Sequence, residues 1–337
     1  RISNGLSQKI YNFNENKIKS LRMLGTNSGI SINLAIHLDT FYIFAVKKIN
    51  PFLDETREIE FNKKYSHRCF TRFYGNLYDD GQIIGFVYEF MSNGSISNFF
   101  ERNSNKSDIL FSFLTMLRLF QGIKYLHSNN LIHRDLKPSN ILIDHDFIPF
   151  ISDFETIREI RNEKNIIDEK FTRDFASSIY ASPEQVSDGK ISYPTDIYSF
   201  GAIIYYLFEK KDMIQVDKNL NFQTSNIYNE IKEEKIFEML NCSPTIEYIY
   251  KSSVKYKADD RIKLNDIENE ISKEINNFYY IENFLKEGYD QQKMPELIQY
   301  LQENIIIQRK DLNTFNNFIK HIFNFTIFSL MSEENKS

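Results

Sequence analysis

The chain of 337 residues is 42% hydrophobic and 26% charged, the composition of a globular protein large enough for one sizeable domain or two lobes. A net charge of −5 without a basic block argues against nucleic acid as a partner. The two cysteines, Cys69 and Cys242, are too few for a disulfide framework or a cysteine metal cluster, and they favour a reducing compartment, cytoplasmic or otherwise intracellular.

The first third of the chain carries the pattern of short strands. Residues 34–48 alternate and are rich in β-branched and aromatic side chains, which predicts two strands joined by a turn at Asp39–Thr40. Residues 56–65 have helical composition, and residues 72–91 predict a hairpin whose turn is "DDGQ". These elements indicate a small sheet accompanied by one helix.

The pattern then becomes helical. Apolar residues recur at helical spacing over 109–126, and residues 195–210 predict a buried helix. Strands followed by helices indicate the α+β class. We expect a small antiparallel-sheet lobe at about 21–91 and a larger, mainly helical lobe at about 92–275.

The two ends of the chain are expected to lie outside this domain. Residues 1–20 are interpreted as an N-terminal flank and residues 276–337 as a helical C-terminal extension. The most apolar late segment, 322–331, is too short and too polar to cross a bilayer. The sequence therefore predicts no membrane span. No charged and then apolar leader is visible, and because Arg1 is not a start Met, the natural N-terminus is expected to lie further upstream.

The polar stretch "LIHRDLKPSNILI" carries side chains suited to phosphate chemistry. It places the carboxylate of Asp135, the ammonium of Lys137 and the amide of Asn140 in one short loop between apolar flanks. A carboxylate can orient a hydroxyl or accept its proton, an ammonium can neutralise a phosphoryl group, and an amide oxygen can bind Mg²⁺. Shortly afterwards, "ISDFETIRE" offers the carboxylate of Asp153, with Glu155 two residues beyond it.

The motif "HRDLKPSN", with "FAVKK", "YASPEQ" and "DIYSFG" in the same order, resembles eukaryotic protein kinases. The resemblance covers roughly 21–275 and implies the bilobal kinase fold. It also implies transfer of the γ-phosphoryl group of ATP, with Mg²⁺ or alternatively Mn²⁺, to a hydroxyl of a protein substrate. Lys137 resembles the serine/threonine type, and "DIYSFG" resembles the tyrosine-kinase-like group.

The same resemblance implies roles for individual side chains. Lys47 is implied to bind the α- and β-phosphates and to pair with Glu58, for which Glu60 is the alternative. Asp135 is implied to orient the acceptor hydroxyl, assisted by Lys137. The implied metal ligands are Asn140 and Asp153. The residues implied to contact the nucleotide are Leu24, Gly25, Asn27, Ile32, Ala45, Lys47, Glu89 and Met91.

Further residues are implied to be structural or regulatory. The implied structural residues are His133, Phe154, Glu184, Asp196 and Arg261. Among them, Arg261 is the expected buried partner of Glu184. Arg134 suggests control by a phosphate on the activation segment, and Thr172 and Ser178 are the candidate sites for an upstream kinase.

Several positions depart from the family pattern. In the glycine-rich loop only Gly25 stands in register, with Asn27 and Ile30 at positions of the other glycines. Asn62 is polar where the family places an apolar residue against the Phe of its D-F-G motif, and burying it is costly unless it is hydrogen-bonded. Glu155 replaces the Gly of that motif.

These departures leave two functions open. In an active kinase, Glu155 modifies the switching of its loop and leaves Asp153 able to bind metal. In a pseudokinase, which binds nucleotide as a scaffold or an allosteric module, the Glu155 side chain displaces the productive geometry. Tyr88 is bulky and is expected to close the pocket behind the adenine.

Overall fold

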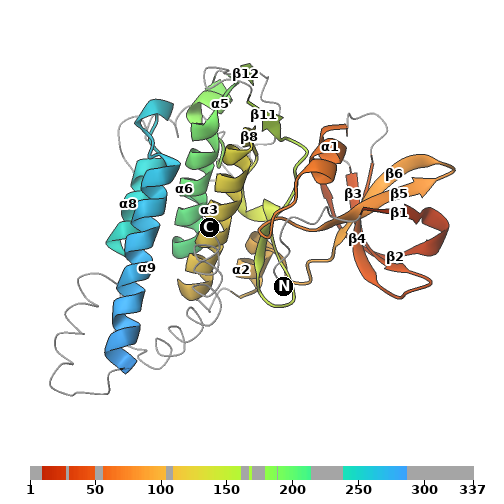
Figure 1. Ribbon diagram of the computed structural model, residues 1–337, viewed down its shortest axis with the longest axis horizontal. Helices are drawn as coiled ribbons and strands as arrows, with labels where there is room; N and C mark the ends of the chain where they lie inside the picture. Colours follow the sequence, from red (N-terminus) through yellow and green to blue (C-terminus); the bar gives the residue numbers. More distant parts are fainter. Residues whose placement is uncertain are drawn as a thin grey trace, which may run out of the picture. The chain divides into compact units, whose positions relative to one another are not determined.

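The computed structural model describes residues 10–27, 30–49, 56–103, 109–160, 167–168, 179–187, 189–213 and 238–286. The chain forms two compact units. The sheet unit comprises Arg1–Asn103, Gln121–Arg134 and Pro138–Arg161. The helical unit comprises Ser104–Phe120, Asp135–Lys137 and Asn162–Ser337. This division confirms the predicted α+β class, since strands dominate one unit and helices the other (Figure 1).

The sheet unit is built on a six-stranded sheet with the order β1-β5-β6-β4-β3-β2. The strands are β1 (Tyr11–Asn14), β2 (Ile18–Asn27), β3 (Ile30–His37), β4 (Ile43–Lys48), β5 (Phe73–Asp79) and β6 (Gln82–Glu89). All neighbours pair antiparallel except β1 and β5, which pair parallel. The predicted turn after β3 and the predicted β5–β6 hairpin are confirmed. Asp80 and Gly81 form the turn of that hairpin, with positive φ angles of 45° and 80°.

The segment before β2 adds a strand to the sheet. After β1, the short 3-10 helix η1 (Glu15–Lys17) connects one edge strand of the sheet to the other edge strand, β2. Gly75 makes this possible, because a Cβ atom there would lie only 1.8 Å from the carbonyl oxygen of Tyr11. Phe13 packs against the sheet core, and Glu15 forms an ion pair with Lys48.

The other elements of the sheet unit are short. They are α1 (Thr56–Lys64), β7 (Gly94–Ser95), α2 (Ile96–Arg102), β8 (Leu131–Ile132), η2 (Pro138–Asn140), β9 (Ile141–Ile143), β10 (Pro149–Ile151) and β11 (Arg158–Glu159). Strands β7, β9 and β10 form a three-stranded sheet, and β8 pairs with β11. The helix predicted at 56–65 is therefore confirmed as α1.

The helical unit is centred on a buried helix. The helix α3 (Ile109–Ser128) contributes its first part to this unit, which also contains β12 (Ile167–Asp168), α5 (Pro183–Ser187), β13 (Lys190–Ile191), α6 (Tyr193–Glu209), α8 (Pro244–Ser253), η3 (Ala258–Asp260) and α9 (Leu264–Lys286). Ser192 and Thr195 form a capping box at the start of α6, the helix predicted near 195–210.

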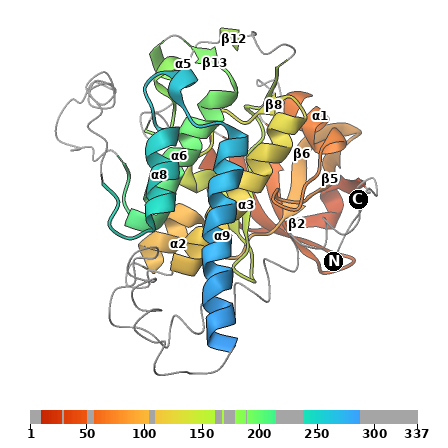
Figure 2. The same cartoon turned by 60° about the vertical axis from the view of Figure 1, so that its left-hand side comes forward.

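Close packing of α6 against α8 depends on Gly201. A Cβ atom at this position would lie 2.6 Å from the Cβ of Ser253, so only glycine lets the two helices approach this closely. Figure 2 shows α8 beside α6, and α9 packs against α8. Among the described residues, none of the helices combines the length and the apolar character that crossing a membrane requires.

Candidate active site

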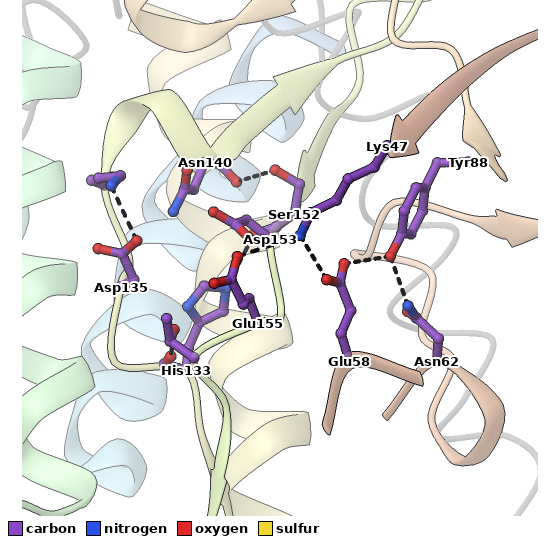
Figure 3. Close-up of polar contacts among 12 residues, drawn as sticks. Lys47, Glu58, Asn62, Tyr88, His133, Asp135, Asn140, Ser152, Asp153 and Glu155 are labelled. Carbon is purple, nitrogen blue, oxygen red and sulfur yellow. Dashed lines mark hydrogen bonds and ion pairs between the residues drawn. The ribbon is translucent and has the colours of Figure 1, made fainter. Parts of the chain in front are cut away.

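A buried ion pair joins the sheet to the helix α1. The Lys47 Nζ atom lies 2.6 Å from Oε2 of Glu58, and the two side chains are 7% and 2% exposed. Lys47 reaches this position because it lies on the inner strand β4, between β3 and β6. Glu58 is the glutamate of α1 that meets this lysine, and Glu60 is exposed to solvent. Figure 3 shows the two side chains pointing toward each other.

Lys47 is surrounded by carboxylates. Besides Glu58, Oε2 of Glu155 lies 3.5 Å and Oδ1 of Asp153 lies 3.8 Å from its Nζ atom. Burial alone lowers the pKa of Lys47, but the charges of these three carboxylates outweigh burial and raise that pKa above its ordinary value. Burial raises the pKa of Glu58, while the charge of Lys47 opposes the shift. The lysine is therefore a permanent cation, and its three carboxylates leave a surplus of negative charge around it.

Asp153 and Phe154 are held in a fixed arrangement. Asp153 has a left-handed backbone with φ of 65°, a conformation that costs energy for a residue other than glycine and that occurs at functional sites. Phe154 is 1% exposed, and its ring stacks on Phe61 of α1 at a centroid distance of 4.3 Å. Phe70 and His133 lie at 4.9 and 5.4 Å from the same ring. The aromatic ring thus anchors the segment that presents the Asp153 carboxylate.

Asn140 is tied to the same segment. Its backbone oxygen accepts hydrogen bonds from the backbone N–H and the hydroxyl of Ser152, both at 2.9 Å. The residue before the implied ligand Asp153 is therefore fixed to the implied ligand Asn140. An amide oxygen and a carboxylate are hard oxygen donors, so this pair of side chains fits a Mg²⁺ ion.

His133 and Arg134 support the backbone beside this segment. Nε2 of His133 lies 3.2 Å from the carbonyl oxygen of Ser152, and the carbonyl oxygen of His133 accepts a hydrogen bond from the Thr156 hydroxyl at 2.7 Å. Arg134 has a φ of 74° and donates to the carbonyl oxygen of Thr156 at 3.3 Å. The candidate phosphorylation sites Thr172 and Ser178 lie outside the described residues.

Asp135 and Lys137 belong to the helical unit. The Lys137 Nζ atom lies 3.0 Å from Oδ2 of Asp135, and the two side chains are 17% and 10% exposed. A carboxylate held beside an ammonium can accept a hydrogen bond from a hydroxyl while the ammonium carries charge toward a phosphoryl group.

The helical unit also contains the predicted Glu184–Arg261 pair. Two guanidinium nitrogens of Arg261 contact the two carboxylate oxygens of Glu184 at 2.7 and 2.6 Å, and the Arg261 side chain is fully buried. This two-point contact is the strong form of an arginine–carboxylate pair. Asp196 is likewise fully buried, in the first turn of α6.

The implied nucleotide contacts lie on β2, β3, β4 and the end of β6. In the β2–β3 pairing, Gly25 lies opposite Ile32, Asn27 lies opposite Ile30, and a Cβ atom at Gly25 would meet open space. Ile30 is buried at the start of a regular strand, so the altered loop avoids placing this β-branched residue at positive φ. The remaining implied contacts are Leu24 on β2, Ala45 on β4, Glu89 at the end of β6 and Met91 just after it.

Sequence reasoning missed one connection at this site. The Tyr88 hydroxyl donates to Oε1 of Glu58 at 2.5 Å and accepts from the amide of Asn62 at 2.7 Å (Figure 3). Asn62 is therefore hydrogen-bonded, and Phe61, one residue earlier, stacks on Phe154. The sequence indicated only that a polar residue buried one turn from Glu58 requires a partner, and it did not indicate which residue supplies that partner.

Comparison with known proteins identifies the family. Residues 18–275 match the model of the protein kinase domain. The chain is 29% identical over 209 residues to mitogen-activated protein kinase kinase 3 of Arabidopsis thaliana, covering 59% of this chain and 39% of the relative. It is 31% identical over 233 residues to the L-type lectin-domain containing receptor kinase VIII.1 of the same plant, covering 64% and 30%.

A third relative is the dual specificity mitogen-activated protein kinase kinase 1 of Dictyostelium discoideum, 29% identical over 194 residues, covering 56% of this chain and 28% of the relative. The chain thus spans well under half of the length of each of these three relatives. The kinase-domain match extends over most of the sequence. The chain therefore belongs to the protein kinase family.

Proposed function

We propose that the protein is an ATP-dependent serine/threonine kinase that transfers the γ-phosphoryl group of Mg-ATP to a hydroxyl of a protein substrate. The observation that carries this proposal is the buried contact of Lys47 with Glu58, with the Asp153 carboxylate 3.8 Å from the same ammonium. Phosphoryl transfer depends on positioning and on charge stabilisation, and a permanent cation beside a metal-binding carboxylate supplies both.

Each polar side chain has a distinct task in this reaction. Lys47 holds the α- and β-phosphates, and Glu58 orients Lys47. Asn140 and Asp153 would supply oxygen ligands to Mg²⁺, and the bound ion would neutralise charge on the phosphates. Asp135 accepts a hydrogen bond from the attacking hydroxyl, and Lys137 stabilises charge on the transferred group.

The proposal is tested by transfer of labelled γ-phosphate from Mg-ATP to a mixture of basic peptides that contain serine, threonine or tyrosine. We expect phosphoserine or phosphothreonine from the wild-type protein. Asp135→Asn keeps the shape of the side chain and removes its charge, so we expect transfer to fall at least 100-fold while ATP binding is retained. Wild-type transfer that equals that of Asp135→Asn would refute the catalytic assignment.

A peptide mixture also separates the two acceptor classes. Lys137 resembles the kinases that phosphorylate serine and threonine, whereas one relative carries the name of a dual specificity kinase. Phosphotyrosine as the dominant product would contradict the serine/threonine assignment and leave phosphoryl transfer itself intact.

The contact between Glu155 and Lys47 favours a second candidate function, that of a pseudokinase that binds nucleotide without transfer. Oε2 of Glu155 lies 3.5 Å from the ammonium that the phosphates require. A carboxylate that kept this position would compete with ATP for Lys47. Saturable binding of Mg-ATP without any transfer to peptides would support this function.

Regulation and location belong to the same proposal. A phosphate placed on Thr172 or Ser178 by an upstream kinase would have Arg134 as its partner. Substitution of both hydroxyl residues by alanine, with activity unchanged, would refute this control. We also propose an intracellular location, because the two buried free cysteines favour a reducing environment.

A further inference from the structure

Three buried side chains form the inner face of α1. Glu58, Phe61 and Asn62 have the i, i+3, i+4 spacing that places residues on one side of a helix, and they are 2%, 4% and 5% exposed. Phe61 supplies the apolar contact, to Phe154. The other two residues are polar, and both reach the Tyr88 hydroxyl on β6. Two of the three buried side chains of α1 therefore form hydrogen bonds with the same hydroxyl group.

The chemistry of these groups fixes the direction of the hydrogen bonds. An ionised carboxylate can only accept, so the Tyr88 hydroxyl points its hydrogen at Oε1 of Glu58. The Asn62 amide nitrogen then donates to the oxygen of that hydroxyl. The second carboxylate oxygen of Glu58, Oε2, accepts from Lys47 at 2.6 Å. Both oxygens of Glu58 are engaged, which holds its carboxylate against rotation.

The Tyr88 hydroxyl remains a donor throughout the physiological pH range. Burial, followed by the negative charge of Glu58, raises the pKa of Tyr88 well above its ordinary value. The proton that is directed at Glu58 therefore stays on the hydroxyl.

Glu155 competes with Glu58 for the ammonium of Lys47. Oε2 of Glu155 lies 3.5 Å from the same ammonium, and its side chain is 29% exposed, against 2% for Glu58. Glu155 can therefore exchange its contact with Lys47 for contact with water. The two carboxylates approach Lys47 from different segments, the helix α1 and the loop after β10, so the carboxylate that is better fixed determines where the ammonium lies.

We propose that Asn62 and Tyr88 are positioning residues that hold Glu58 against Lys47 and thereby keep the ammonium in place for the nucleotide phosphates rather than for Glu155. The inference rests on the proposed function in that Lys47 is taken to bind those phosphates. In this proposal Asn62 has a function at the site, because it begins the chain of hydrogen bonds that runs through Tyr88 and Glu58 to Lys47 and fixes α1.

The experiment compares binding of Mg-ATP with binding of adenosine by calorimetry. Adenosine lacks the phosphates that Lys47 contacts, so a change in the position of Lys47 alters only the binding of ATP. For Tyr88→Phe we expect about a tenfold loss of ATP affinity, equivalent to about 1.4 kcal/mol, with adenosine affinity unchanged. For Asn62→Leu, which acts through Tyr88, we expect about a threefold loss.

Two matched variants control for the loss of a polar group from the same sheet. Tyr74→Phe removes a hydroxyl from the partly buried Tyr74 on β5, and Asn76→Leu removes a buried amide whose bond to Tyr78 is long, at 3.5 Å. We expect both controls to bind the two ligands as the wild-type protein does. Equal losses for ATP and adenosine in Tyr88→Phe would show a general structural effect and overturn the proposal.

A second comparison tests the rivalry with Glu155. In a Glu155→Gln background the competing charge is absent, so Tyr88→Phe should weaken ATP binding only about twofold instead of tenfold. An equal loss in both backgrounds would contradict the idea that Tyr88 directs Lys47 away from Glu155.

Hydrogen exchange separates this proposal from the proposed function. In the nucleotide-free protein, we expect the amides of α1 to exchange about tenfold faster in Tyr88→Phe than in Tyr74→Phe, with the α6 amides unchanged as a reference for an intact fold. If wild-type protein binds neither ligand, the proposed function fails, and this measurement still decides the role of Tyr88. Unchanged exchange in α1 would refute it.

Discussion

The charge of Glu155 is expected to weaken ATP binding by occupying Lys47. At the observed separation of 3.5 Å, the attraction between the two charges is about 1.2 kcal/mol in water and about 4.7 kcal/mol at an effective dielectric constant of 20. The Glu155 side chain is 29% exposed, so the lower part of this range applies, about 1–2 kcal/mol. Phosphates that bind Lys47 must replace this interaction. Glu155→Gln should therefore tighten ATP binding about 5- to 30-fold.

The size of this gain depends on the divalent ion. A Mg²⁺ ion held by Asp153 would attract the nearby Glu155 carboxylate and would offset part of its competition with the phosphates for Lys47. Calorimetry should therefore show a larger gain for Glu155→Gln without Mg²⁺ than with it. Glu159→Gln makes the same charge change at an exposed position of the same segment and should leave affinity unchanged. The reasoning is refuted if the two variants bind ATP equally well under both conditions.

The structure supports three further predictions about stability, each measured by urea denaturation. Gly75→Ala places a Cβ atom against the Tyr11 carbonyl oxygen, so β1 must shift and unfolding should require about 1–3 kcal/mol less. Arg261→Leu leaves the Glu184 charge without its two-point partner and should cost about 3–5 kcal/mol. Burial raises the pKa of Glu274, so the stability contributed by its protonated form is present below the ordinary value of 4.5 and is lost as pH rises through the folded-state pKa. Glu274→Gln should therefore stabilise the protein by about 1–2 kcal/mol at pH 7 and have little effect at about pH 4.

Matched variants distinguish these effects from general destabilisation. Gly25→Ala adds the same methyl group to the sheet where a Cβ atom meets open space, and it should be tolerated. Arg261→Lys keeps the charge but loses the fork geometry, and it should cost less than Arg261→Leu. An equal gain in the free energy of unfolding at both pH values for Glu274→Gln would contradict the assignment of the effect to ionisation.

Local sequence signals predicted the elements of this fold well because their causes lie within a few residues. The turn "DDGQ" contains Asp80 and Gly81, which tolerate the positive φ angles that this hairpin requires. The strand β1 has no comparable signal. Its four residues, "YNFN", alternate aromatic and polar side chains, but this run is at the lower limit of length for a strand pattern, and its pairing depends on the absence of a side chain at Gly75, more than 60 positions away.

The candidate site likewise has parts that the sequence predicted and parts that it did not. The polar side chains of the contiguous "HRDLKPSN" motif could be interpreted from their chemistry, and Lys47 and Glu58 were implied by the resemblance to protein kinases, Lys47 through "FAVKK". The hydrogen bond between Asn62 and Tyr88 could not be predicted from the sequence, because it joins residues 26 positions apart on a helix and a strand. Its formation depends on which face α1 turns inward, and that face is fixed by packing rather than by local preference.

The departures from the family pattern share a physical feature. Asn62 is polar at a position where an apolar residue is usual, and it donates to Tyr88. Glu155 is charged where the family has glycine, and it contacts Lys47. A polar group that is buried without a partner costs about 1–3 kcal/mol, and the buried Asn62 avoids this cost through its hydrogen bond to Tyr88. Both replacements therefore have partners, Asn62 with Tyr88 and Glu155 with Lys47, and we expect the balance between Glu58 and Glu155 at that lysine to set how tightly a nucleotide binds.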